Sequence, residues 1–124
     1  MPALPIYDRG FTQEEIDFGF EKFVEGVREI KAEHDNRLFP GLVEAGQREE
    51  IRVDAGRVYW KIVKHRSGTD NHTSVYCFVR KADGAILKSA TWKAPALNHA
   101  RGFVTESDHG LHCAGPYGAV YLRR

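Results

Sequence analysis

The stretch FTQEEIDFGFEKFVEGVREIKAEH, residues 11–34, constrains the fold most, because it predicts a long amphipathic helix. Thr12 followed by Glu15 forms a capping box, and Phe11 with Ile16 fits the hydrophobic staple that often accompanies it. The apolar residues recur at helical spacing: Ile16, Phe20, Phe23, Val24, Val27 and Ile30. We therefore expect an acidic amphipathic helix over residues 12–34 that buries one apolar stripe.

Three residues of this helix fall outside the simple pattern. Phe18 points away from the stripe, so it is either an isolated surface aromatic or part of a partner interface. Gly19 and Gly26 flank the stripe and permit a neighbouring backbone to approach closely.

Residues 50–124 change to the alternating, β-branched and aromatic pattern of strands. EEIRVDAG predicts a short strand and a turn, RVYWKIVKH a longer strand, and TSVYCFVRKADGAILKSATW a hairpin that turns at residues 82–84. Residues 35–47 predict a connector with one short helical turn, and GAVYLRR is a candidate edge strand. The expected fold is a single α+β domain, residues 1–124: one long N-terminal helix packed on an antiparallel sheet of four or five strands, with a short helix after the meander.

The register of the hairpin decides which side chains share a face of the sheet. A two-residue turn at 83–84 would pair Val79 with Lys88 and place this lysine in the core. A three-residue turn with a left-handed glycine and a bulge pairs Val79 with Leu87 and Phe78 with Lys88. We expect the bulged register, since it keeps Lys88 out of the core. The face toward the helix then carries Val58, Trp60, Ile62, Val75, Cys77, Val79 and Leu87. The opposite face carries Arg57, Tyr59, Lys61, Tyr76, Phe78, Arg80, Lys88 and Trp92.

Charge is divided between the two halves of the chain. Residues 1–56 hold seven basic and thirteen acidic residues, a net charge of −6, whereas residues 57–124 hold eleven basic and four acidic residues, a net charge of +7. An anionic partner is expected to meet the second half, unless the halves neutralise each other within the fold or across an oligomer. Aromatic and basic side chains that alternate on one face are typical of sheets that bind nucleotides or nucleic acid. The same pattern fits a subunit interface or a face covered by a later segment.

The stretch TWKAPALNHARG, residues 91–102, predicts a short helix from Pro95 to Arg101. Proline is tolerated at the first helical position, and Gly102 suits the residue after the last turn. Free N–H groups at this helix start, beside Lys93, would form an anion site. The alternative is that these cations are solvated or pair with the acidic helix. The expected ligand-binding residues are Arg57, Lys61, Tyr76, Lys88, Trp92, Lys93, Asn98 and Arg101.

The sequence contains no familiar catalytic or phosphate-loop motif, and we expect neither an enzyme nor a cofactor. His109, His112 and Cys113 lie close together, but their spacing matches no common zinc pattern, so we expect no metal. A metal there would need a fourth ligand from His65, His72 or Cys77. A Cys113–His112 nucleophile pair is the remaining catalytic alternative. Without an export signal or membrane-spanning segment, the two cysteines fit reduced thiols in a cytoplasmic setting.

The second half resembles a group of small, mostly uncharacterised bacteriophage proteins. The resemblance rests on AGRVYWKIV, on SVYCFVRKADGAILKSATWKAPALNHARG and on GPYGAVYLRR, which match a G-R-x-Y-x-K-[IV] strand, an S-V-[YH]-x-F-[VI] strand and a G-x-[IL]-x-K-x-A-[ST]-W-K-A-P-A turn before A-R-G. Asn98 and His99 stand where that group has lysine and histidine. The resemblance implies a phage origin and the host bacterial cytoplasm, and it supplies no activity.

These observations lead to two expected functions. The first is a non-enzymatic, homo-oligomeric binder of a phosphate-bearing nucleotide, which by analogy with small phage proteins would sequester a host-defence nucleotide signal. The second is a nucleic-acid or protein-binding module that uses the whole basic and aromatic face. No membrane partner is expected.

Overall fold

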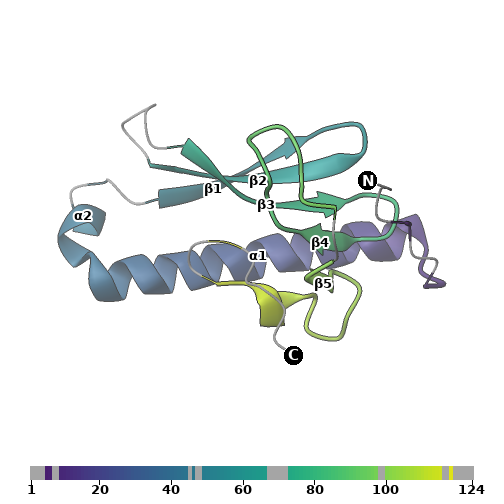
Figure 1. The fold of residues 1–124 in the computed structure, drawn as a ribbon. Helices are drawn as coiled ribbons and strands as arrows, with labels where there is room; N and C mark the ends of the chain where they lie inside the picture. The colour runs from purple at the N-terminus through teal and green to yellow at the C-terminus, as the bar shows by residue number, and fades with distance from the viewer. Residues whose placement is uncertain are drawn as a thin grey trace.

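A computed structural model describes residues 5–6, 9–44, 46, 49–66, 73–97, 100–115 and 118. One long helix lies along a five-stranded antiparallel sheet whose strands follow chain order, so the expected α+β class is confirmed (Figure 1). The helices are α1 (Gln13–Leu38), α2 (Pro40–Glu44) and the 3₁₀ turn η1 (Leu111–Cys113). The strands are β1 (Glu49–Ala55), β2 (Tyr59–Arg66), β3 (Thr73–Arg80), β4 (Ala85–Leu87) and β5 (Gly102–Phe103).

Helix α1 begins as its sequence predicts. The Thr12 hydroxyl accepts the Glu15 N–H at 3.1 Å, and the Glu15 carboxylate accepts the Thr12 N–H at 3.0 Å, so the capping box is confirmed. The helix continues to Leu38 instead of ending near residue 34, and α2 fills the expected connector. It ends where Phe39 precedes Pro40, because the residue before a proline avoids the helical conformation.

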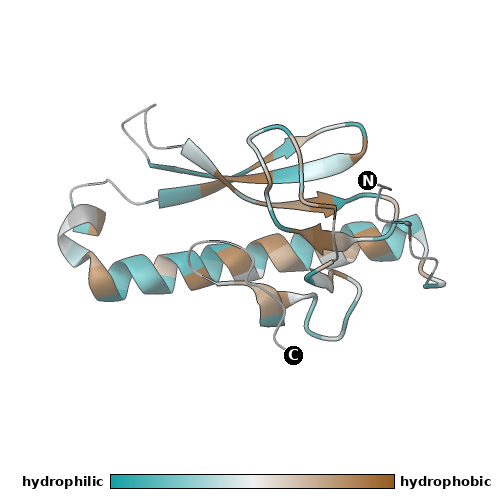
Figure 2. Cartoon of the chain, in the orientation of Figure 1, coloured by the Kyte–Doolittle hydropathy of each residue, from teal (hydrophilic) through white to brown (hydrophobic). Residues whose placement is uncertain are grey.

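The apolar stripe of α1 packs on one face of the sheet. Ile16, Phe20, Phe23, Val24 and Val27 are buried in the same cluster as β-strand side chains. The Phe20 ring stacks on the Trp60 ring, with centroids 4.0 Å apart. Figure 2 shows hydrophobic and hydrophilic stretches alternating along the ribbon of α1, as expected for a helix with one apolar side. This packing holds the sheet against the helix.

The close approach expected at the α1 glycines is confirmed for Gly19. A side chain at Gly19 would meet the Val104 backbone carbonyl, so the chain after β5 can lie directly on the helix only because this position is glycine. At Gly26 the neighbour is the Leu111 side chain rather than a backbone.

The register expected for the β3–β4 hairpin is wrong by one residue. Phe78 pairs with Leu87, and Val79 pairs with Ile86. The turn contains four residues, since the Gly84 N–H donates to the Arg80 carbonyl at 2.8 Å, although Gly84 is left-handed as expected (φ 73°). Leu87 therefore lies beside Phe78 on the face away from α1.

This turn is fastened by a buried ion pair. The Arg80 guanidinium donates two hydrogen bonds to the Asp83 carboxylate, at 3.0 and 2.6 Å, and both side chains are almost completely buried. Asp83 also accepts the Ala85 N–H at 3.1 Å. These bonds account for the extra turn residue, because they hold Asp83 inside the loop.

A bulge between Ile62 and Val63 corrects two further expectations. Ile62 pairs with Cys77 but Val63 pairs with Val75, so Tyr76 is the extra residue of β3. A bulge reverses the side-chain alternation beyond it. Tyr76 consequently joins the α1-facing core, whereas Val75 packs on the opposite side.

The second face of the sheet is not an open basic and aromatic surface. Phe78, Ala85 and Leu87 form a small buried cluster, and Leu97 and Ala100 from the segment between β4 and β5 pack on it. Figure 1 shows this segment crossing the sheet on the side opposite α1. The structure thus agrees with the alternative interpretation of the sequence pattern, in which a later segment of the chain covers this face.

The short helix expected from Pro95 to Arg101 is wrong. Pro95 instead forms an antiparallel bridge with Ser89, and the Ala96 N–H donates to the Lys88 carbonyl at 2.7 Å. Residues 89–95 are a tight loop. The N–H groups at the expected helix start include that of Ala96, which already donates to the Lys88 carbonyl and so does not face a ligand. The candidate edge strand at the C-terminus falls almost entirely outside the described residues. Within the described ranges, no helix has both the length and the apolar character that crossing a bilayer requires.

We predict that Asp83→Asn lowers the free energy of unfolding by about 3 kcal/mol or more, because it leaves the buried Arg80 charge without its carboxylate. The matched control is Asp54→Asn, which breaks the exposed Arg52–Asp54 pair and is expected to cost less than about 1 kcal/mol. Urea unfolding followed by tryptophan fluorescence measures both. Equal losses in the two variants would contradict this assignment of the turn.

Candidate functional site

Three of the expected binding residues line one groove, which we call the Arg57 groove. It has a volume of about 420 Å³ and lies where the β1–β2 turn, β2, β3 and the loop after β4 meet. Its lining residues are Asp54, Ala55, Gly56, Arg57, Val58, Tyr59, Lys61, Phe78 and Lys93. The fold therefore brings Lys93 next to Arg57 and Lys61, which lie more than thirty residues earlier in the chain.

The local backbone places these cations at the edge of the groove. The Gly56 N–H donates to the Tyr59 carbonyl at 2.9 Å and closes the β1–β2 turn around Arg57. The Thr91 hydroxyl accepts the N–H groups of Lys93 and Ala94, at 3.2 and 3.1 Å, and so fixes the tip of the loop. Each cation thus stands on a closed turn or a strand.

Trp92 lies next to the groove, and its ring faces Lys61. The Lys61 ammonium is 3.5 Å from the ring centroid, within the range of a cation–π contact, and Trp92 is 45% exposed. The pKa of Lys61 is lowered, mainly because the ammonium is partly buried. The Asp54 carboxylate acts in the opposite direction and raises this pKa, whereas the Arg52 charge lowers it further. An exposed aromatic ring and a cation are therefore held together at the groove.

The groove contains an excess of positive charge. Its single carboxylate, Asp54, is held by the Arg52 guanidinium in two hydrogen bonds, at 2.9 and 3.1 Å. The side chains of Arg57 and Lys93 form no ion pair with any of the described residues. Arg57 and Lys93 are thus available to an anionic ligand.

The other expected residues do not join this groove. The Tyr76 hydroxyl donates to the Gly115 carbonyl at 2.6 Å, and burial raises the pKa of Tyr76 well above its usual value. Arg101 is almost completely buried, and Lys88 is half-buried and does not line the groove. Asn98 lies outside the described residues. Tyr59 also lines the groove but was not among the expected residues, although its place between Arg57 and Lys61 in the sequence could have identified it.

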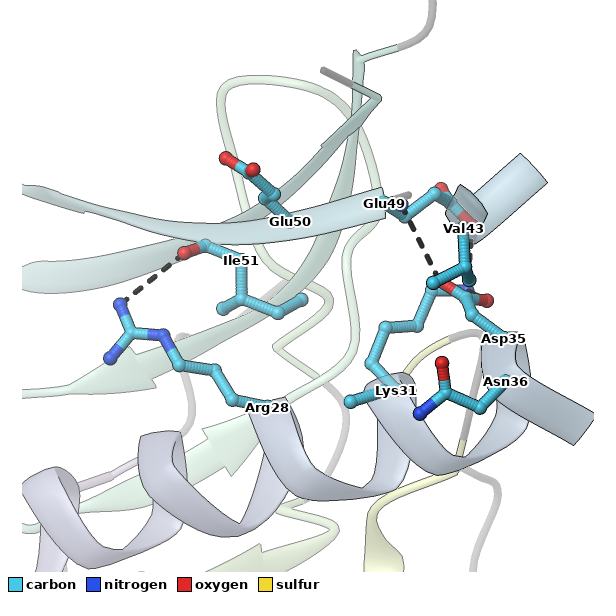
Figure 3. A pocket seen from close by; sticks show the side chains of 9 residues that line it. Arg28, Lys31, Asp35, Asn36, Val43, Glu49, Glu50 and Ile51 are labelled. Carbon is cyan, nitrogen blue, oxygen red and sulfur yellow. Dashed lines mark hydrogen bonds and ion pairs between the residues drawn. The ribbon is translucent and has the colours of Figure 1, made fainter. Parts of the chain in front are cut away.

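A second hollow, of about 340 Å³, lies between α1, α2 and β1 (Figure 3). Its buried Lys31 contacts Glu49 at 2.6 Å and Asp35 at 3.6 Å, while Arg28 donates to the Ile51 carbonyl at 3.3 Å. Burial by itself would raise the pKa of Glu49, but the hydrogen bond and charge of Lys31 hold it below its usual value. These groups tie the end of α1 to β1, so we interpret them as structural.

The Cys113 and His112 side chains, considered for metal binding and for nucleophilic catalysis, contact different partners. Burial, with the nearby Glu106 and Asp108 charges, raises the pKa of the Cys113 thiol to about 12, and this thiol donates to the Gly110 carbonyl. His112 instead faces Asp108, at 3.0 Å. Glu106, Asp108 and His112 each have a ligand-type atom within 4.8 Å of the others. Glu106 and Asp108 also accept backbone N–H groups, so the three residues form the framework of this turn.

A family model described as a family of unknown function (DUF7717) matches residues 13–118. No curated protein and no solved structure matches the chain.

We predict that both cysteines react slowly with a thiol reagent in the folded protein. Burial raises the pKa of the Cys77 thiol well above its usual value, as it does for Cys113. Because the thiolate is the reactive form, the native rate at neutral pH is expected to be on the order of a thousandfold below the rate in denaturant. A colorimetric disulfide reagent measures both rates, and Cys77→Ser isolates Cys113. Rapid native labelling of that variant would contradict the buried position of Cys113.

Proposed function

The chain belongs to DUF7717, a family of unknown function, and we propose that it is a non-enzymatic binding protein for a phosphate-bearing nucleotide. The observation that carries this proposal is the convergence of Arg57, Lys61 and Lys93 on one groove beside the exposed ring of Trp92. The phosphate groups bind Arg57 and Lys93, and the base stacks on Trp92 or Tyr59.

The chemistry of the groove supports an anionic ligand with an aromatic part. A guanidinium offers paired donors to phosphate oxygens, and an ammonium adds a mobile point charge. Stacking of one base on an aromatic side chain contributes about 1–3 kcal/mol in single-strand binders. A volume of about 420 Å³ also falls within the range of small-molecule sites.

The covered second face favours a compact ligand over a long nucleic acid. Tyr76 and Phe78 are buried, so they offer no platform on which successive bases could stack. The exposed cations of the groove are few and close together. Binding of a nucleotide without turnover would lower its free concentration, which is how such a protein would sequester a host-defence signal.

We predict that a panel of mono-, di- and cyclic nucleotides contains at least one ligand that quenches Trp92 fluorescence and gives a saturable calorimetric signal. Arg57→Ala and Lys93→Ala are each expected to weaken binding about tenfold or more, because each removes a charge-assisted hydrogen bond. Arg37→Ala, which removes an exposed arginine from the end of α1, is the matched control and leaves the affinity unchanged. No signal with any nucleotide would contradict the proposal.

Salt dependence distinguishes the compact site from a nucleic-acid surface. Two phosphate contacts, at Arg57 and Lys93, predict a slope shallower than about −1.4 for the logarithm of the binding constant against the logarithm of the salt concentration. The value of about −0.7 per contact holds for a single-stranded polymer, and a small nucleotide has fewer counterions to release. We expect this slope for the nucleotide identified above. A single-stranded oligonucleotide that binds more tightly than the nucleotide, with a slope of about −4 or steeper, would favour the nucleic-acid alternative.

A further inference from the structure

A separate hollow of about 320 Å³ lies beside the start of α1, and we call it the Phe18 hollow. One side comes from the helix and the other from the chain after β5, which lies on the helix at Gly19. Its lining residues are Phe11, Thr12, Glu14, Glu15, Phe18, Gly19, Val104, Thr105 and His109. None of these residues belongs to the Arg57 groove.

The hollow has exposed aromatic walls. Phe18 is 55% exposed and Phe11 is 40% exposed, although each would be favoured inside a core. The Phe18 and His109 rings form an edge-to-face contact, with centroids 6.0 Å apart. The Lys22 ammonium lies 5.4 Å from the Phe18 ring, so this ring already attracts a cation.

Two buried polar atoms in the lining have no hydrogen-bond partner among the described residues. They are the Thr105 hydroxyl oxygen and His109 Nδ1. Buried polar atoms are usually paired, and these two have almost no exposed surface, so they make the wall of the hollow polar without being open to a ligand. Among the described residues, His109 is the non-glycine residue with positive φ, at 56°, in the left-handed region that histidine adopts more often than most residues.

The charge of the hollow is negative. Glu14 and Glu15 line it, and the described residues of its lining include no lysine or arginine. One oxygen of Glu15 caps the helix start, whereas the Glu14 side chain forms no hydrogen bond or ion pair with the described residues. The capping box and the two carboxylates offset the positive end of the α1 dipole. The hollow therefore offers hydrogen-bond acceptors, negative charge and aromatic faces.

We propose that the Phe18 hollow binds the guanidinium group of an arginine in a basic peptide segment of a partner protein. A guanidinium carries five N–H donors, is weakly hydrated and stacks on aromatic rings. Glu14 pairs with the charge, and Phe18 with Phe11 covers the planar face.

The test uses a blocked tetrapeptide with two central arginines and its citrulline counterpart, which keeps the shape but lacks the charge. Calorimetry is expected to show saturable binding of the arginine peptide and binding about tenfold weaker for the citrulline peptide. Phe18→Ala is expected to weaken arginine-peptide binding about three- to fivefold. Glu14→Gln is expected to weaken it to a similar extent.

Matched controls separate this site from general acidity and from the nucleotide site. Phe39→Ala removes another exposed phenylalanine, and Glu21→Gln removes a carboxylate of the same helix that does not line the hollow. Both controls, and Arg57→Ala, are expected to bind the peptide as the native chain does. Circular dichroism checks that each variant is folded. Absent binding, equal affinity for the two peptides, or equal losses in controls and test variants would overturn the proposal.

Discussion

The buried ion pair between Arg80 and Asp83 determines how the second layer of this fold is arranged. By holding Asp83 inside a four-residue turn, it places Leu87 opposite Phe78. The two side chains then form an apolar patch on the face away from α1, which must be covered. The segment between β4 and β5 covers this patch.

The candidate nucleotide site depends on the same covering segment. Because Leu97 packs on the second face, the loop at residues 89–95 stands above β2, where Trp92 meets Lys61. Lys93 reaches the β1–β2 turn in the same way. Lys93 is therefore positioned by an apolar contact on its own side of the sheet, whereas Arg57 lies on the β1–β2 turn and Lys61 on β2.

Local patterns in the sequence predicted the parts of the fold that depend on neighbouring residues. The capping box at Thr12 and the stripe of α1 are examples, since both follow from interactions between residues three or four positions apart. The bulge at Tyr76 depends on pairing between strands, which the sequence pattern does not encode locally. The hairpin register depends on the ion pair between Arg80 and Asp83, which are three positions apart but are buried only through the surrounding fold. The helix expected at Pro95 failed for the same reason: a suitable local sequence formed a bridge to Ser89 instead.

The binding residues follow a similar division. Arg57 and Lys61 were expected near each other and do line one groove, because only four positions separate the β1–β2 turn from Lys61 on β2. Tyr76 and Arg101 were lost to the interior through distant contacts. The division of charge between the halves of the chain does persist in space: the Arg57 groove is cationic, and the Phe18 hollow is lined by carboxylates. Two such surfaces on one small domain do not neutralise each other, because Arg57, Lys93 and Glu14 have no ion-pair partners among the described residues. Each surface can therefore attract a ligand of opposite charge without first breaking an internal salt bridge at these residues.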